Sequence, residues 1–138
     1  MTREDIIAAA RGFLGVPFVH QGRTRIGGVD CIGLVLNVGW QLGFLARSYD
    51  VTGYARMPDG SLFAECDRLL VRIPAAAPGC IVAMRFSSEP QHIGIVGTHA
   101  GSLTIIHSLS DAGKVAEHRM SPEWRGCIVG CFDAPGVS

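Results

Sequence analysis

The stretch HIGIVGTHAGSLTIIHS, residues 92–108, predicts a β-hairpin. Two short apolar runs, 92–98 and 103–108, lie on either side of the turn signal His99-Ala100-Gly101-Ser102. Comparable β-like runs occupy residues 80–86, 114–119 and 127–132. Short runs separated by turn residues are typical of an antiparallel meander, so the second half of the chain is predicted to form one sheet.

The first half of the chain is predicted to be helical. Thr2 is a capping residue for a helix that ends near Gly15. Residues 31–45 are too long and too evenly apolar for a strand, and Asp30 stands where a helix cap belongs. A short helix follows from Ser61 to about Leu70. Helices first and a meander afterwards indicate an α+β fold.

Size and composition limit the possible classes of protein. The 138 residues suit a single domain, 1–138, and 48% hydrophobic residues supply a packed core. Twelve basic and twelve acidic residues give a formal net charge of +0, which argues against a nucleic-acid partner. No apolar run reaches the roughly 18–20 residues of a membrane span, so we expect no membrane insertion. The N-terminus does not resemble a secretory signal, so synthesis in the cytoplasm is expected.

Cys31 is the first candidate for chemistry. The chain has five cysteines, and this odd number argues against a disulfide framework. A thiol at a helix start is predicted to have a lowered pKa, and a thiolate is the active nucleophile. Gly27, Gly28 and Gly33 are expected to let the backbone approach a substrate closely. The alternative, an inert buried cysteine, is equally compatible with the position alone.

His92 and His107 are the next candidates. If the hairpin turns on Ala100 and Gly101, residue 94 faces residue 107, and the two histidines share one sheet face. Their backbones would then lie roughly 7 Å apart as diagonal neighbours. Gly94 would leave room for a ring, and one imidazole would orient the other as a base. A shift of one residue would instead leave two unrelated histidines.

The remaining cysteines do not indicate a metal site. Cys127 and Cys131 are four residues apart, but the segment is predicted to be a strand, and no second pair with zinc-ligand spacing is present. Cys66 and Cys80 are predicted to be core residues. We therefore expect neither a metal nor another cofactor.

Several other polar residues have simpler interpretations. His99 and His118 are predicted to face solvent, and Asp59 to form a turn. Arg23 and Arg25 either meet an anionic substrate or are solvated loop arginines, the commoner case.

Motifs in a fixed order along the chain carry a family resemblance. They are GVPFVHQG at 15–22, DCIGLV at 30–35, Pro78-Gly79, QHIGI at 91–95 and IIH at 105–107. Together they resemble the NlpC-type cell-wall cysteine peptidases, which have a papain-like fold. The variant His20-Gln21-Gly22, the stretch YARMPDG at 54–60, and the ending Ile128-Val129-Gly130, Phe132 and Pro135-Gly136 are similar to the subgroup of phage and gene-transfer-agent tails.

The resemblance implies roles for individual residues. Cys31 would be the nucleophile, His92 the general base and His107 the residue that orients His92. Asp30 would hold the amino end of the substrate, with His20 and Gln21 as further substrate-binding candidates.

Three positions depart from the family pattern. Phe18 replaces a tyrosine whose hydroxyl would support the oxyanion site, Ile32 replaces a serine, and Cys80 replaces an aspartate. Loss of one oxyanion donor costs on the order of a hundredfold in rate, although backbone amides can also serve.

The implied activity is hydrolysis of peptidoglycan stem peptides between γ-D-glutamate and meso-diaminopimelate. The implied partners are tail-tip or baseplate hub proteins, and the implied location is the tail tip of a virion or gene-transfer agent. Two alternatives remain open: an inactive structural tail-tip component, and an acyltransferase that uses the same three residues.

Overall fold

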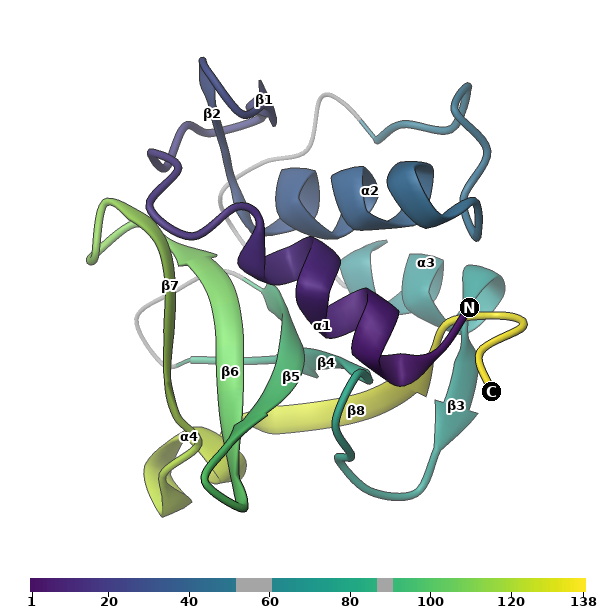
Figure 1. Cartoon of the computed structure of the whole chain (residues 1–138), viewed down its shortest axis with the longest axis vertical. Coiled ribbons are helices and arrows are strands. Elements are labelled where there is room, and N and C mark those ends of the chain that lie inside the picture. Colours follow the sequence, from purple (N-terminus) through teal and green to yellow (C-terminus); the bar gives the residue numbers. More distant parts are fainter. Residues whose placement is uncertain (52–60, 87–90) are drawn as a thin grey trace.

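The computed structural model describes residues 1–51, 61–86 and 91–138. The predicted turn at Asp59 and the tail-like motif at 54–60 lie outside these residues. In the described residues, three helices precede an antiparallel sheet and a short fourth helix lies before its last strand, so the predicted α+β class is confirmed (Figure 1). None of the helices in the described ranges is long and apolar enough to cross a membrane.

The central sheet has six strands in the described part of the chain. They are β3 (Val71–Ile73), β4 (Ile81–Met84), β5 (His92–His99), β6 (Ser102–Leu109), β7 (Lys114–Arg119) and β8 (Ile128–Asp133). Their order is β3-β8-β4-β5-β6-β7, with every neighbouring pair antiparallel. The five predicted strands are therefore confirmed, and β3 is an additional strand at one edge. The predicted meander holds only for β4 to β7, because β8 lies between β3 and β4 instead of beside β7.

The β5–β6 hairpin has the predicted register. Ile95 pairs with Ile106, and Val96 with Ile105. The turn residues Ala100 and Gly101 have φ values of 51° and 82°. Positive φ at both central positions gives the twist that a two-residue hairpin needs.

The two N-terminal helices have the predicted starts and earlier ends. Helix α1 (Arg3–Arg11) begins with a capping box between Thr2 and Asp5, but stops four residues before Gly15. Helix α2 (Cys31–Leu42) is capped by Asp30 and ends where Gly43 takes a left-handed φ of 83°. The third helix, α3 (Ser61–Leu69), ends within one residue of the prediction.

Besides β3, three further short elements were not predicted. Strands β1 (Arg23–Thr24) and β2 (Gly28–Val29) form a hairpin just before Cys31, and α4 (Pro122–Gly126) leads into β8. Elements of two to five residues are too short to show a hydrophobic period, although Ser121 followed by Pro122 is a helix-start signal.

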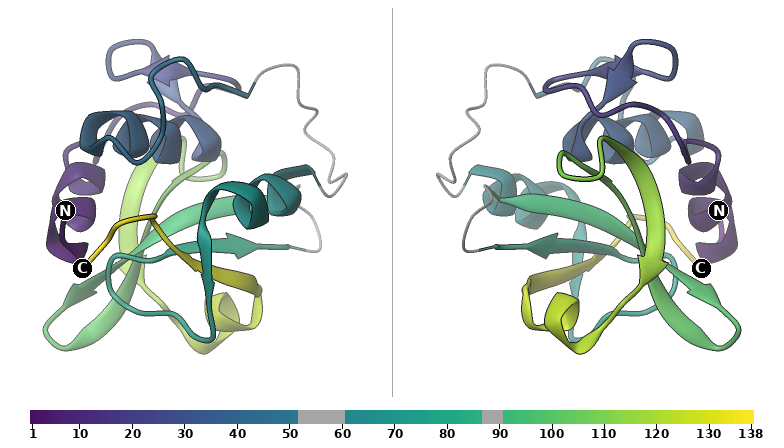
Figure 2. Two further views of the ribbon diagram at one scale, coloured as in Figure 1. Left: turned by 90° about the vertical axis from the view of Figure 1, so that its right-hand side faces the viewer. Right: turned by 90° about the vertical axis from the view of Figure 1, so that its left-hand side faces the viewer.

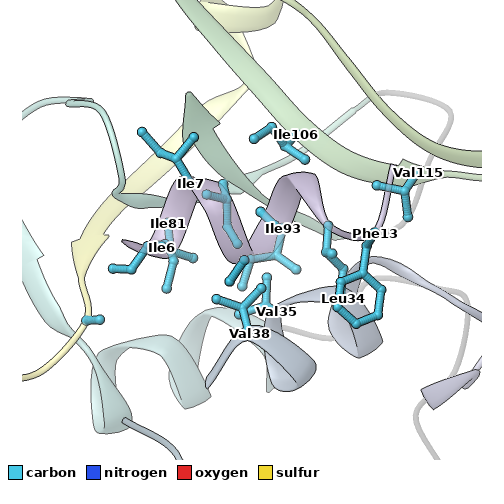
Figure 3. Close-up of a cluster of buried hydrophobic side chains, with 14 of the residues drawn as sticks. Ile6, Ile7, Phe13, Leu34, Val35, Val38, Ile81, Ile93, Ile106 and Val115 are labelled. Carbon is cyan, nitrogen blue, oxygen red and sulfur yellow. The ribbon is translucent and has the colours of Figure 1, made fainter. Parts of the chain in front are cut away.

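The sheet has an apolar layer on each face. On one face α1 and α2 pack against the sheet through residues that include Ile6, Phe13, Leu34, Ile93 and Ile106 (Figure 3). The second cluster includes Val82, Met84, Val96 and Ile105, with Trp124 of α4 packed against it. Figure 2 shows α4 at a distance from α1 and α2. Cys66 and Cys80 are buried core residues, as predicted.

Candidate active site

Asp30 holds the start of α2 in place. Its Oδ1 accepts a hydrogen bond from the Gly33 amide at 2.8 Å, and its Oδ2 accepts one from the Gln21 amide at 2.8 Å. Arg23 Nη1 lies 3.2 Å from Oδ1, and His20 Nδ1 lies 4.0 Å from Oδ2. Asp30 is only 3% exposed. The predicted substrate-binding residues Asp30, His20 and Gln21 thus lie close together. Both oxygens of the Asp30 carboxylate accept hydrogen bonds from backbone amides of the protein itself.

The glycines around Cys31 serve internal packing. A Cβ atom at Gly33 would lie 2.1 Å from the Gly22 carbonyl oxygen, and one at Gly28 would lie 2.8 Å from the Pro17 carbonyl oxygen. Gly33 and Gly28 are both buried. The expectation that Gly28 and Gly33 let the backbone approach a substrate closely is wrong, because the space beside each is filled by backbone of the protein itself.

The Cys31 thiol lies in the first turn of α2, but its pKa is not lowered. Burial and the charge of Asp30 raise the pKa of Cys31 to about 12, although the residue keeps partial exposure. The backbone amides of Ile93, Ile32 and Cys31 act in the opposite direction. The predicted helix-start effect is therefore outweighed by desolvation, and the resting sulfur is protonated near pH 7.

His92 and His107 meet as the hairpin register predicted. His92 Nε2 lies 2.7 Å from His107 Nδ1. Gly94 provides the space, since a Cβ there would lie 3.2 Å from the Cβ of His107 and 2.7 Å from Cδ1 of Ile105. The Ile93 amide, next to His92, faces the Cys31 sulfur. The first residue of β5 and the first residue of α2 are thus close in space.

Both histidines are neutral in the folded protein. Burial lowers the pKa of His92 to about 4, partly offset by Asp30. Burial, together with His92 and His118, lowers the pKa of His107 to about 2. With the thiol and both imidazoles neutral, Cys31 can attack an acyl group only if a base takes the thiol proton as sulfur attacks.

These shifts predict a loss of stability in acid. Near pH 7 His92 is neutral in both states, whereas below its ordinary pKa of 6.5 the unfolded chain takes up the proton first. At about 1.4 kcal/mol per pKa unit, His92 should lower the free energy of unfolding by roughly 3 kcal/mol between pH 7 and pH 4.

Urea titrations at the two pH values measure this loss. His92→Gln should show a smaller loss between pH 7 and pH 4, and His99→Gln, at the exposed end of β5, should match the wild type. An equal loss in all three proteins would contradict the prediction.

His118 corrects another expectation. It does not simply face solvent: its Nε2 lies 2.8 Å from His107 Nε2, and its ring centroid lies 4.7 Å from that of Trp124. His99, in contrast, is exposed as predicted. The sequence did contain a signal for this contact. With Ile105 paired to His118, as in the observed register of β6 and β7, residues 105, 107 and 118 lie on one face of the sheet.

Arg23 and Arg25 are engaged within the protein. Arg23 donates to Asp50 Oδ1 at 2.9 Å and to the Val51 carbonyl at 2.6 Å, besides its contact with Asp30. Arg25 donates to the Gly12 carbonyl at 2.7 Å, and its guanidinium lies 4.3 Å from the centre of the Phe13 ring. Arg23 is therefore not a solvated loop arginine, and the commoner interpretation is wrong for it. Arg25 is exposed in the turn between β1 and β2, as that interpretation predicts.

No metal centre is formed by the described residues. Within 1–51, 61–86 and 91–138, no group of three or more His, Cys, Asp or Glu side chains is arranged to hold a metal ion. Cys127 ends α4 and Cys131 lies in β8, so the two are not in one strand as predicted.

Known structures share this arrangement of elements. No model of a known protein family and no curated protein sequence matches the chain. Among solved structures, the NlpC/p60 domain of the peptidoglycan hydrolase SagA superposes with a TM-score of 0.61 at 17% identity, over 96% of this chain and 99% of that domain. An NlpC/p60 protein of Bacillus cereus superposes with a TM-score of 0.67 at 17% identity, over 97% of this chain and 40% of that protein.

This chain has the NlpC/p60 fold. A Bacteroides uniformis N-acetylmuramoyl-L-alanine amidase is also similar, with a TM-score of 0.53 at 14% identity over 94% of this chain and 96% of that one. The chain spans about two fifths of the length of the Bacillus cereus protein. The predicted papain-like NlpC-type architecture is therefore confirmed at the level of the fold.

Proposed function

We propose that this protein is a cysteine peptidase that hydrolyses amide bonds of peptidoglycan stem peptides. The observation that carries the proposal is the 2.7 Å contact between His92 and His107, together with the amide of the adjoining residue Ile93, which faces the Cys31 sulfur at the start of α2. A nucleophile, a base and a residue that orients the base are the parts that acyl transfer through a cysteine requires.

The geometry suggests a general-base mechanism. As the Cys31 sulfur attacks the carbonyl carbon, its proton passes to His92 Nδ1, the ring nitrogen opposite the one bonded to His107. In this mechanism, backbone amides at the start of α2 would stabilise the oxyanion. The imidazolium then protonates the leaving amine, and water hydrolyses the thioester.

For the substrate, we propose the bond between γ-D-glutamate and meso-diaminopimelate. The resemblance of the motifs around Cys31 and His92 to cell-wall peptidases supports this bond. The peptidoglycan hydrolase and the N-acetylmuramoyl-L-alanine amidase among the similar structures support peptidoglycan as the substrate class.

Mass spectrometry of purified sacculi tests the proposed bond. Digestion should release muropeptides cut between these two residues. The absence of products would favour the structural tail-tip alternative, for which Phe18 in place of tyrosine is the supporting feature, and transferred acyl groups would favour an acyltransferase.

We propose further that the protein acts at the tail tip of a phage-like particle, held by hub proteins. The support is the similarity of residues 20–22, 54–60 and 128–136 to the tail subgroup. Proteomics of purified particles should find the protein in low, stoichiometric copy number.

Its absence from particles but abundance in lysing cells would indicate a release lysin. Activity on free tri- or tetrapeptides, but not on sacculi, would indicate a recycling enzyme.

A further inference from the structure

We propose that His118 is a positioning residue that acts through His107 to keep the Nδ1 atom of His92 free of a proton. This inference rests on the proposed roles of Cys31 and His92 as nucleophile and base. His118 is not one of the three residues with proposed catalytic roles, Cys31, His92 and His107. Its own hydrogen bonds determine which nitrogen donates in each contact between the imidazoles.

Three imidazoles form one continuous line. His92 Nε2 lies 2.7 Å from His107 Nδ1, and His107 Nε2 lies 2.8 Å from His118 Nε2. His118 Nδ1 lies 2.9 Å from the carbonyl oxygen of Arg119. In a neutral imidazole one nitrogen donates and the other accepts, so each contact determines the next.

The Arg119 carbonyl determines which nitrogen donates and which accepts in each hydrogen bond of this line. A carbonyl oxygen can only accept, so in a neutral His118 ring Nδ1 carries the proton and Nε2 accepts. His107 Nε2 must then donate, which leaves His107 Nδ1 as an acceptor. His92 Nε2 therefore donates, and His92 Nδ1 is left with a lone pair, as a general base requires.

The surroundings favour this arrangement over a charged one. His107 is 0% exposed and His92 is 7% exposed, and burial lowers the pKa of both rings. The Trp124 ring lies 5.1 Å from the His107 ring and 4.7 Å from the His118 ring, which confines both. Ser121 caps α4 and thereby holds Trp124, because its hydroxyl accepts from the Trp124 amide at 3.4 Å.

The direction of the line matters again during the reaction. When His92 Nδ1 takes the Cys31 proton, the S–H bond breaks and its electron pair stays on sulfur. The resulting imidazolium donates from Nε2 to the lone pair of His107. If the line ran the other way, Nδ1 of His92 would already carry a proton and could not accept another.

Two variants separate hydrogen bonding from packing at position 118. His118→Phe keeps a ring against Trp124 but removes the acceptor for His107. His118→Gln removes the ring but offers an amide oxygen to His107 and an amide nitrogen to the Arg119 carbonyl. His99→Phe is the matched control, because His99 is an exposed histidine outside the line.

Nitrogen-15 NMR of the imidazoles and steady-state kinetics provide the readouts. In the wild type, His92 should be protonated at Nε2 and not at Nδ1. His118→Phe should give a mixture of His92 tautomers and lower kcat about 10- to 100-fold, the usual range for an orienting partner, with KM changed less than about threefold. His118→Gln should restore the tautomer and most of kcat, while His99→Phe should match the wild type.

The inference and the proposed function can fail separately. A wild-type His92 protonated at Nδ1 would overturn the inference even if no variant folds. A folded His118→Phe variant with both the tautomer and kcat unchanged would overturn it as well. If the wild type shows the expected tautomer, and His118→Phe disturbs it, but sacculi are not cut, the line of histidines stands and the proposed peptidase function falls.

Discussion

Cys31→Ala is expected to lower kcat on peptidoglycan by about 10⁴-fold or more, because removal of a nucleophile leaves only binding and oxyanion stabilisation. The fold should survive, since Cys31 is half-buried and alanine is a good helix former at the start of α2. Cys31→Ser should be similarly inactive, because a serine hydroxyl is a much weaker nucleophile at its ordinary pKa.

Cys127→Ser is the matched control for this experiment. Cys127 is also a half-buried free thiol, but it lies at the end of α4. The control should retain the wild-type rate, and thermal melts should show all three variants folded. Continued cleavage by folded Cys31→Ala would exclude Cys31 as the nucleophile.

Asp30→Asn is expected to lower the free energy of unfolding by about 3 kcal/mol or more, since it breaks a buried charged network by altering one partner. Both carboxylate oxygens accept hydrogen bonds from backbone amides, and Arg23 lies 3.2 Å from Oδ1. An asparagine amide nitrogen would face either an N–H donor or a guanidinium and leave buried donors unpaired. Urea denaturation at pH 7 measures the loss.

Asp50→Asn is the control for losing one negative charge beside Arg23 without disturbing a buried carboxylate. Asp50 also pairs with Arg23, at 2.9 Å, but its side chain is 37% exposed, so the loss should stay below about 1 kcal/mol. If Asp30→Asn kept its stability but raised KM, Asp30 would have the substrate-binding role that the family resemblance implies. A large loss of stability would instead make it the residue that anchors the loop of residues 20–23 to α2.

Strand parity made the pairing of His92 with His107 predictable. Side chains alternate across a sheet, so a turn on Ala100 and Gly101 is sufficient to place both rings on one face. The same rule would have included His118 if the register of β7 against β6 had been derived. The turn between those strands is longer, and its glycine at position 113 does not define a register alone.

The pKa of Cys31, in contrast, could not be predicted from the sequence. A helix start favours a thiolate, and the backbone amides there do lower the pKa. The outcome depends on how many protein atoms surround the sulfur and on the nearby Asp30 charge, which raise the pKa to about 12. Both are properties of the packed chain, and neither follows from the local pattern of residues.

The sequence by itself determined the α+β class, five strands, the helix starts at Thr2 and Asp30, and the shared face of His92 and His107. These features depend on periodicity, caps and turn residues within a few positions of one another. Only the tertiary structure decided that Gly33 packs against the Gly22 carbonyl, that Asp30 is bonded within the protein, and that His118 completes the line of imidazoles. Each of these contacts joins separate elements, and its chemistry depends on burial, which exists only once those elements have packed together.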